Sequence, residues 1–407
     1  MNTESHCTCR DHLSSASRLE SDLLEGWSEI EKIRTEWDAL VDQTSYPTTY
    51  STFNFCVYGW SHFHKDDSSP FVVTVRDNGK LVAVFPLRRE ISYVYKIKYT
   101  LLQPLHTTET DKPYPLIANS FEQASWHAFS DCLKAHKGTW DILYWPEIPD
   151  QLHGVEPIQQ AFLNIKPYTV ETHADVFGPI LNLDQTWEEF RAKHRKLRKA
   201  VARINNKLEG GVHLKVYRTP AEIDTAIEIY SSIENSGWKA GKIGVARNDI
   251  SRNFYRDLAG EMSKNDQIRI GVLYHGTTAI SAEIAYTCGN RVFFSHGTYD
   301  PAYKDVSPGK ISTGLFIKEF LDDDFKHGDF LAGFAHYLTP WCDELMTTTK
   351  VYVYNRRPAV RAIWAWRKTK TWLKEKYKNH PMIKAAAENI YTRIAKAFGI
   401  DVNKANA

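Results

Sequence analysis

One segment of the chain has residue types and spacing suited to binding a phosphorylated ligand. Residues 299–310, with the sequence YDPAYKDVSPGK, join a predicted strand to a predicted helix. Ser307 suits the N-cap of that helix, Pro308 its first position, and Gly309 lets a ligand approach the backbone. The free N–H groups and the positive end of the helix dipole favour a pyrophosphate there. An ordinary capped helix would have the same residues, so this pattern leaves both interpretations open.

Glu283 is a second candidate, because it is a carboxylate on the otherwise apolar strand predicted over 279–286. Facing a cleft, it could take the proton from an ammonium acceptor as a general base. The alternative is a strand residue that points outward into solvent. Asp300, at the end of the following strand, is a reserve candidate for the same role, and a turn-forming carboxylate explains it equally well.

Hydrophobic periodicity and turn residues predict a mixed α/β chain with two similar halves. The first half has predicted helices over 27–40 and 53–63, a hairpin turning at 77–79, a strand over 95–103, a helix near 121–137 and a strand over 140–146. The second has a helix over 185–209, a strand over 212–217, helices over 220–235 and 250–263, a hairpin over 268–287, a strand over 291–298 and a helix over 308–323. Each half places helices before a hairpin, which predicts an internal repeat.

The composition is typical of a folded protein without a dedicated nucleic-acid surface. Of the 407 residues, 43% are hydrophobic and 25% charged, and 51 Lys and Arg against 49 Asp and Glu give a net charge of +2. The six cysteines lack metal-site spacing, and the sequence contains no His-Glu-x-x-His, Walker or nucleophile-elbow motif, so we expect no metal. Without an apolar signal region or membrane-spanning run, a cytoplasmic protein is expected, with the inner face of the membrane as one location.

The segment from Pro358 onward differs from the rest, since it is basic and contains Trp364, Trp366 and Trp372. It is predicted to be one helix interrupted near Pro381. Such a helix could pack on its own domain or on a second subunit. Because Trp beside Lys and Arg suits a headgroup layer, residues 358–398 could also dock on a membrane surface or a partner protein.

The second half resembles the GNAT-like acyltransferases of the CelD/BcsL type, which are tandem relatives of the Fem aminoacyl transferases. The segments that resemble the family are LDQTWEEFRAKHRKLRKAVARINNKLE, SSIENSGWKAG, IRIGVLYHGTTAISAEIAYTCGNRVFFSHGTYDPAYKDVSPGK and GDFLAGFAHYLTPW, in the family's order. The resemblance implies an α/β fold of two tandem GNAT-like mixed-sheet domains and a C-terminal helical tail. We expect a disordered tail over 1–20, a degenerate first domain over 21–170, an acyltransferase domain over 171–357 and a basic Trp-rich tail over 358–407.

The resemblance also implies how acyl-CoA, with acetyl-CoA as the expected form, is bound as a co-substrate. In this family the strand before the loop binds the pantetheine arm, and the following helix start holds the CoA pyrophosphate. Carried over to this sequence, the phosphate-binding residues are Ser307, Pro308, Gly309 and Lys310. Tyr299 and Asp300 lie at the strand end, where they could shape the acyl and acceptor pocket and join Glu283 as catalytic candidates.

Five further residues are expected to bind the acceptor: Trp238, Lys239, His336, Tyr337 and Trp341. Trp238 and Lys239 match a family motif whose aromatic ring and cation suit an acyl group or an anionic acceptor. As single residues, Trp238 would more often be core and Lys239 solvated. Where many relatives have Tyr-Lys before a later Trp, this chain has Tyr337 followed by Leu338, which puts the acceptor's identity in doubt. His336 could supply a titratable group there, or could be structural.

The predicted function is transfer of an acyl group to an amine, with an amino sugar or an envelope or exopolysaccharide precursor as the acceptor. One alternative is Fem-like aminoacyl transfer from tRNA, and another is a non-catalytic scaffold of an envelope-polysaccharide assembly. The predicted helix 185–209 contains several basic residues, namely Arg195, Lys196, Arg198, Lys199 and Arg203. They form either a solvated face or an electropositive rim for CoA or a phosphorylated acceptor, and specific nucleic-acid binding is not expected.

Overall fold

The computed structural model describes residues 19–377 except 65, 106, 108, 153, 164–167, 238, 322, 324, 334–337, 339, 340 and 356. The helices are α1 (Trp27–Ile30), α2 (Arg34–Leu40), α3 (Phe53–Phe63), α4 (Glu122–Ala135), α5 (Val155–Leu163), α6 (Trp187–Lys193), α7 (Arg195–Lys207), α8 (Pro220–Asn235), α9 (Asp249–Met262), α10 (Pro308–Leu321) and α11 (Pro358–Tyr377). The strands are β1 (Glu20–Leu24), β2 (Ser68–Asp77), β3 (Lys80–Val94), β4 (Ile97–Pro104), β5 (Leu116–Ile117), β6 (Ile142–Pro149), β7 (Thr169–Asn182), β8 (Val212–Tyr217), β9 (Ile268–His275), β10 (Thr278–Cys288), β11 (Arg291–Tyr299), β12 (His327–Asp329) and β13 (Glu344–Tyr354).

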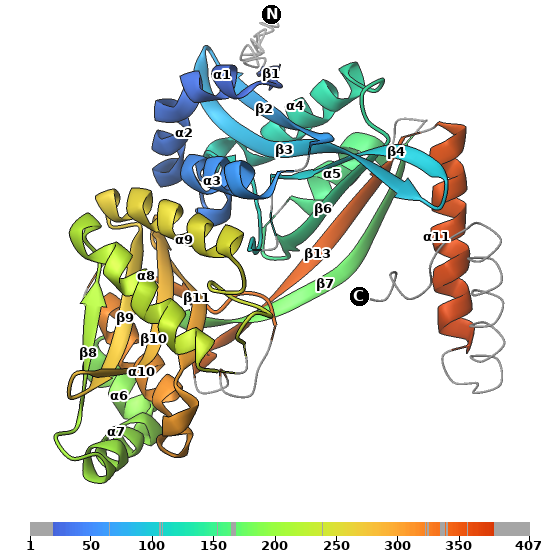
Figure 1. Ribbon diagram of the computed structural model, residues 1–407. Coiled ribbons are helices and arrows are strands. Elements are labelled where there is room, and N and C mark those ends of the chain that lie inside the picture. The colour runs from blue at the N-terminus through green and yellow to red at the C-terminus, as the bar shows by residue number, and fades with distance from the viewer. Residues whose placement is uncertain are drawn as a thin grey trace, which may run out of the picture.

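The strands form one mixed sheet that runs through both halves of the molecule (Figure 1). Its order is β1-β2-β3-β4-β6-β13-β7-β12-β11-β10-β9-β8, and β5 pairs with β3. The long strands β7 and β13 pair antiparallel and connect the two halves. This arrangement confirms the predicted α/β class, with a mixed sheet that extends through both halves.

The predicted repeat is present in the strand connections. In the first half, the hairpin β2–β3 is followed by β4, α4 and β6, and β6 lies parallel to β4. In the second half, the hairpin β9–β10 is followed by β11, α10 and β12, and β12 lies parallel to β11. The domain boundary predicted at 170 falls inside β7, and β13 inserts between β6 and β7, so the exact division of the chain stays a prediction.

Local sequence explains several of these elements. The turn between β2 and β3 uses Asn78 and Gly79 at positive φ, 49° and 83°, which Asn and Gly tolerate better than other residues. The apolar spacing predicted over 27–40 buries its apolar positions, Ile30, Ile33, Trp37 and Leu40, in α1, the short 3-10 turn after it, and α2. The helical pattern therefore identified the face that packs against the core.

Other predictions need correction. The single helix expected over 185–209 is two helices, because His194 leaves helical geometry (φ −101°, ψ 52°) and its ring packs between Phe190 and Trp341. The expected tail over 1–20 extends too far, since Glu20 already pairs with Arg76 in β1. The sequence patterns also missed α5, β7 and β13.

Helix α11 packs beside β4 and β13 at the far end of the first half, as Figure 1 shows, and its Trp364 donates a hydrogen bond to Glu171 (2.7 Å). Residues 378–407, including the predicted interruption near Pro381, lie outside the described residues. Among the described helices, none combines the length and apolar character needed to cross a membrane.

Candidate functional site

The site begins where strand β11 separates from its parallel neighbour β12. Within the described residues, β11 pairs with β12 only over Arg291–Phe293, whereas it stays paired with β10 as far as Tyr299. A register shift between Ile284 and Ala285 leaves Ser295 as the extra residue of a β-bulge. The outer edge of residues 294–299 is thus open to a ligand that can hydrogen-bond an extended backbone.

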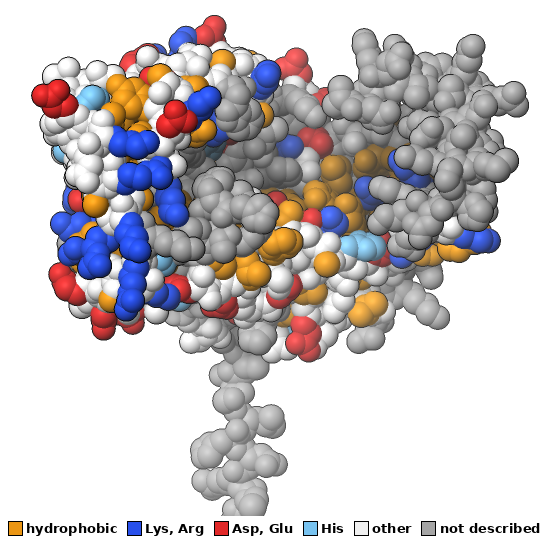
Figure 2. Space-filling view, turned by 90° about the horizontal axis from the view of Figure 1, so that it is seen from below, with side chains coloured by type: hydrophobic (Ala, Val, Ile, Leu, Met, Phe, Trp, Pro, Cys, Tyr) orange, Lys and Arg blue, Asp and Glu red, His pale blue; other side chains and the backbone are white. Residues whose placement is uncertain are grey.

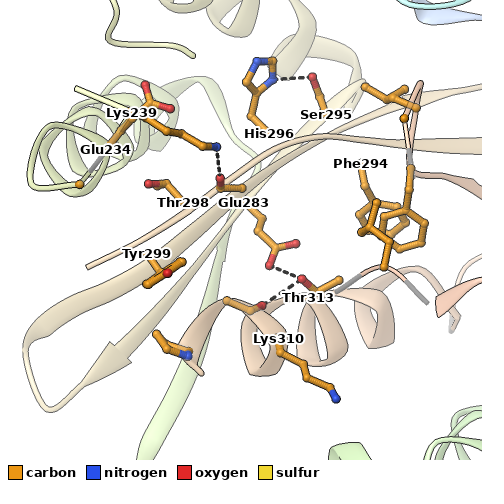
Figure 3. A pocket seen from close by; sticks show the side chains of 18 of the residues that line it. Glu234, Lys239, Glu283, Phe294, Ser295, His296, Thr298, Tyr299, Lys310 and Thr313 are labelled. Atoms are coloured by element: carbon orange, nitrogen blue, oxygen red, sulfur yellow. Dashed lines mark hydrogen bonds between the residues drawn. The ribbon is translucent and has the colours of Figure 1, made fainter. Parts of the chain in front are cut away.

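A cavity of about 970 Å³ lies along this open edge. Its lining includes β11 residues 294–299, the start of α10, and residues 109–111 from the first half. Two side chains show that the cavity reaches both faces of the sheet. Glu283 accepts a hydrogen bond from Thr313 on α10 (Figure 3), whereas His296 contacts Tyr255 on α9.

The start of α10 keeps the predicted position but not the predicted cap. Pro308 is the first helical residue, as expected. An N-cap residue is normally extended, but Ser307 has left-handed dihedral angles (φ 55°, ψ 56°). The reason is that Ser307 also ends the 3-10 turn Pro301–Val306 and donates its N–H to Lys304 O (3.1 Å). The helix has no acidic residue in its first turn. Its free N–H groups and dipole therefore face the cavity without a carboxylate of their own element.

Gly309 and two lysines complete this end of the cavity. A Cβ at Gly309 would meet only the ring of Tyr299, at 3.6 Å, so the backbone here is open to a ligand. Lys304 and Lys310 both line the cavity, and so does Tyr299, which is 41% exposed. The chemistry is that of an anion site with an aromatic wall.

A basic surface adjoins this loop. Arg195, Arg198, Lys199 and Arg203 of α7 are exposed, and Figure 2 shows Lys and Arg side chains gathered on that side of the lower face. Arg203 donates a hydrogen bond to Asp305 O (3.0 Å), which ties α7 to the loop before α10. Nothing is described for the Lys196 side chain. The predicted basic rim is thus next to the candidate phosphate site.

Glu283 is 7% exposed, lines the cavity and accepts a hydrogen bond from Thr313 Oγ1 (2.7 Å). Burial raises the pKa of Glu283 to about 7, and hydrogen bonds from Thr313 and Ser312 offset only part of this increase. Such a carboxyl group is partly ionised near neutral pH and can accept a proton. The alternative interpretation, an outward-facing strand residue, is wrong.

Asp300 has a structural role instead. Its carboxylate caps the 3-10 turn Pro301–Val306 by accepting the N–H of Ala302 (2.9 Å), and the side chain does not line the cavity. The turn-forming interpretation of Asp300 therefore fits the structure.

The predicted acceptor residues separate into three groups. Lys239 lines the cavity, and its ammonium donates to Gly297 O (2.7 Å), while burial lowers the lysine's pKa. Trp341 is in the core, 1% exposed and stacked on Phe190, and so is not a cavity residue. The others, Trp238, His336 and Tyr337, lie outside the described residues. Leu338, expected only as a replacement for Lys, does line the cavity.

Sequence analysis missed several polar residues that line the cavity, among them three carboxylates and a histidine. Glu109 and Asp111 come from the first half, Glu234 ends α8, and His296 lies on β11. Burial raises the pKa of Glu234, whose carboxylate accepts the N–H of Ala246 (2.7 Å). Glu109 and Asp111 come near the second-half residues only in the folded chain, so no local sequence pattern could have identified them. His296 lies on a strand already assigned to the site and could have been noticed.

A buried ion cluster holds the first-half loop against the second half. Lys112 Nζ, fully buried, contacts Asp111 Oδ1 (2.7 Å) and Asp329 Oδ1 (3.1 Å). The other oxygen of Asp111 accepts the N–H of Ala332 (2.6 Å), and Asp329 accepts the N–H of Leu331 (2.8 Å). These bonds fix the cavity wall on both sides of the junction between the halves.

Comparisons with known proteins agree with this geometry. Residues 190–338 match a family model described as "Acetyltransferase (GNAT) domain". A crystal structure of FemX is similar over 84% of this chain and 99% of its own, with a TM-score of 0.57 and 11% identity. A conserved protein of unknown function from Bacteroides thetaiotaomicron is similar over 79% of this chain and 97% of its own, with a TM-score of 0.51 and 8% identity. No curated protein matches.

These findings define a class. The second half carries a GNAT-type acetyltransferase domain, and the chain as a whole shares the fold of FemX. The match to an acetyltransferase domain therefore applies to residues 190–338, and the structural similarity extends the shared fold to the rest of the chain. Within the described residues, no cluster of His, Cys, Asp and Glu is arranged to hold a metal ion.

Proposed function

We propose that the protein is an N-acyltransferase that moves an acyl group, with acetyl as the simplest case, from acyl-CoA to an amine. The observation that carries the proposal is the open edge of β11 leading directly to the free start of α10. An extended, amide-bearing arm can hydrogen-bond residues 294–299, and its pyrophosphate then reaches the N–H groups of Gly309 and Lys310 and the side chains of Lys304 and Lys310.

In this proposal Glu283 is the base. The acceptor arrives mainly as an ammonium ion, and Glu283 removes one proton to give the neutral amine. The amine nitrogen attacks the thioester carbonyl, the C–S bond breaks, and the thiolate leaves. The nitrogen loses its second proton as the amide forms, and that proton balances the one that converts the thiolate to the free thiol. No covalent acyl-enzyme is required, because the cavity brings both substrates together. Backbone N–H groups of the cavity wall polarise the thioester carbonyl.

The order of motifs in the second half further supports the CelD/BcsL type, and with it an amino sugar or an envelope-polysaccharide precursor as the acceptor. In keeping with that type, we place the protein in the cytoplasm, with residues 21–170 and 171–357 as its two domains. Aminoacyl transfer from tRNA is the second candidate, and the exposed basic residues of α7 are the feature that favours it.

The experiment measures acyl-CoA binding by calorimetry and free-thiol release with a panel of amines. The test variant is Gly309→Asp, which adds a negative charge where a phosphate is expected but meets only the Tyr299 ring. Its matched control is Gly138→Asp, at an exposed position with no atom within 4 Å of the new Cβ. We expect Gly309→Asp to weaken CoA binding at least about 10-fold, equivalent to about 1.4 kcal/mol, and the control to leave it unchanged.

Unchanged CoA affinity in folded Gly309→Asp would show that the phosphates bind elsewhere. Absence of CoA binding to the wild-type chain at high micromolar concentration would reject the acyl-CoA proposal. In that case, binding of aminoacyl-tRNA to the wild type would support the second candidate.

A further inference from the structure

A chain of hydrogen bonds lines the end of the cavity opposite α10. It starts at Arg247, whose Nη2 contacts Glu109 Oε1 (2.6 Å), and Tyr255 Oη donates to the other oxygen of Glu109 (2.6 Å). Tyr255 Oη also lies 3.1 Å from His296 Nε2, and Ser295 Oγ lies 2.6 Å from His296 Nδ1 (Figure 3 shows this last contact). The chain joins the first-half loop to the bulge of β11.

Counting protons assigns every donor in this chain. Tyr255 has one hydroxyl proton, and the carboxylate of Glu109 can only accept, so that proton lies toward Glu109. The contact between Tyr255 and His296 then requires Nε2 to carry a proton and donate it. A neutral imidazole protonated at Nε2 has a lone pair at Nδ1, which accepts the hydroxyl proton of Ser295.

The surroundings keep His296 in this neutral form. Burial, assisted by the charges of Lys239 and Arg247, lowers the pKa of His296 to about 3. Glu109 lies 3.8 Å from Nε2, which would favour a charged ring, but the same carboxylate already binds Arg247. His296 therefore holds one tautomer across the physiological pH range.

The consequence is a cavity wall that accepts hydrogen bonds. The protons of Ser295, His296 and Tyr255 are all used within these hydrogen bonds, and the Glu109 carboxylate, which lines the cavity, has lone pairs only. Glu234 adds a second acceptor on this side, and the Lys239 ammonium is directed to Gly297 O. The opposite end, at α10, presents N–H groups and lysines. The two ends of the cavity are thus opposite in hydrogen-bonding character.

We propose that this chain of hydrogen bonds forms the acceptor subsite. The subsite binds an amine that carries neighbouring hydroxyl groups, such as an unphosphorylated amino sugar, rather than an amine that carries a carboxylate or a phosphate at that position. The inference rests on the proposed function and specifies the acceptor's chemistry. It also gives the first half a role in recognition, because Glu109 fixes the arrangement of the chain. Glu109 and Tyr255 are positioning residues that act through His296 and Ser295.

Direct binding tests the subsite without relying on turnover. Calorimetry in the presence of CoA would compare glucosamine with glucosamine 6-phosphate and muramic acid, which add a phosphate and a carboxylate respectively. We expect glucosamine to bind at least about 10-fold more tightly than either anionic probe, as an unpaired negative charge against Glu109 and Glu234 is unfavourable. Equal or tighter binding of an anionic probe, or no binding of glucosamine, would overturn the proposed acceptor class.

Two variants test the chain itself. Tyr255→Phe removes one hydroxyl and keeps the ring packing, and Glu109→Gln removes the charge that orders the chain. Exposed Glu156→Gln, also in the first half, is the control. Both test variants should weaken glucosamine binding about 10-fold, as expected for a lost hydrogen bond to a charged group, with CoA affinity changed less than about 2-fold.

Nitrogen-15 NMR of histidine gives a readout that a purely structural role would not affect. Wild-type His296 should appear as the neutral Nε2–H tautomer between pH 5 and 8, and Tyr255→Phe should give a mixture of tautomers. A wild-type His296 protonated at Nδ1, or an unchanged tautomer in Tyr255→Phe, would refute the chain. If CoA does not bind to the wild type while the tautomer and glucosamine results hold, the acyl-CoA proposal fails and the subsite stands.

Discussion

The two halves of the molecule share a strand–loop–helix connection, from β4 to α4 in the first half and from β11 to α10 in the second, but its ends differ. In the second half, β11 runs on to Tyr299 beyond its pairing with β12, and the next helix starts with no acidic residue in its first turn. In the first half, β4 ends at Pro104, which has no N–H to offer, and α4 starts with Glu122. Tyr114 donates its hydroxyl to that glutamate. The first-half helix therefore carries a negative charge in its first turn, which disfavours an anionic ligand there.

The first-half connection contributes to the other half's site instead. The segment between β4 and α4 brings Glu109 and Asp111 to the cavity wall and Lys112 to the buried ion cluster. A duplicated arrangement of strands and helix can thus bind the ligand in one copy and form a wall of the site in the other. The difference lies in a few side chains around the helix start, not in the order of elements.

The largest expected effect comes from removing the proposed base, Glu283, in the second half. Glu283→Gln keeps the size and hydrogen-bonding reach of the side chain but not its basicity, and kcat should fall by roughly 10²–10⁴-fold. CoA affinity should be nearly unchanged. In the wild type, activity should rise with pH through about 7, because the pKa of Glu283 is raised to about 7 and only its ionised form accepts a proton. Rates measured from pH 5.5 to 9 check both expectations.

The Glu283→Gln variant should partly recover at high pH, since more of the acceptor then arrives as neutral amine. Thr313→Val serves as a comparison that removes the hydrogen bond to Glu283 while leaving its carboxyl group. If Glu283→Gln keeps near-wild-type rates over the whole pH range, Glu283 only binds substrate, and Glu234 becomes the next carboxylate to test.

The second prediction concerns the contact between the halves. Lys112→Met leaves Asp111 and Asp329 buried without their cation, which should lower the free energy of unfolding by about 3–5 kcal/mol. Lys32→Met is the control, because Lys32 and its partner Glu29 are 68% and 55% exposed and their loss should cost under about 1 kcal/mol. Urea unfolding followed by tryptophan fluorescence measures both variants. A small loss in Lys112→Met would mean that the halves hold together through β7 and β13 alone.

Much of the second half could be predicted from the sequence. Short-range signals fixed the hairpin β9–β10, the strand β11 and the start of α10, because turn residues and periodicity act over a few neighbours. Glu283 was identified since a charge on an apolar strand is conspicuous. The αL geometry of Ser307 was not predictable, because two turns meet there and the first of them sets the residue's dihedral angles.

The first-half contributions could not be predicted, for a physical reason. Glu109, Asp111 and Lys112 lie in a connection without periodicity, and each has a partner more than a hundred residues away in the sequence. Trp341 was expected in the site, but the packing of α6 against its ring places it in the core. Strand β13 was missed although it lies at the centre of the sheet, since its pairing partners β6 and β7 come from far earlier in the chain.

The smallest expected effect tests the negative charge at the start of α4. Glu122→Gln removes the negative charge in the first turn of α4 and weakens the bond from Tyr114. The free energy of unfolding should fall by about 0.5–1 kcal/mol, because a carboxylate at a helix N-terminus is worth about that much. Calorimetry should still find a single CoA site of unchanged affinity. A second CoA or phosphate site in this variant would mean that the Glu122 charge alone prevents the first half from binding the same ligand. We expect none, because β4 ends at Pro104, just beyond its pairing with β6 at Leu102, whereas β11 continues from Phe293 to Tyr299 beyond its pairing with β12.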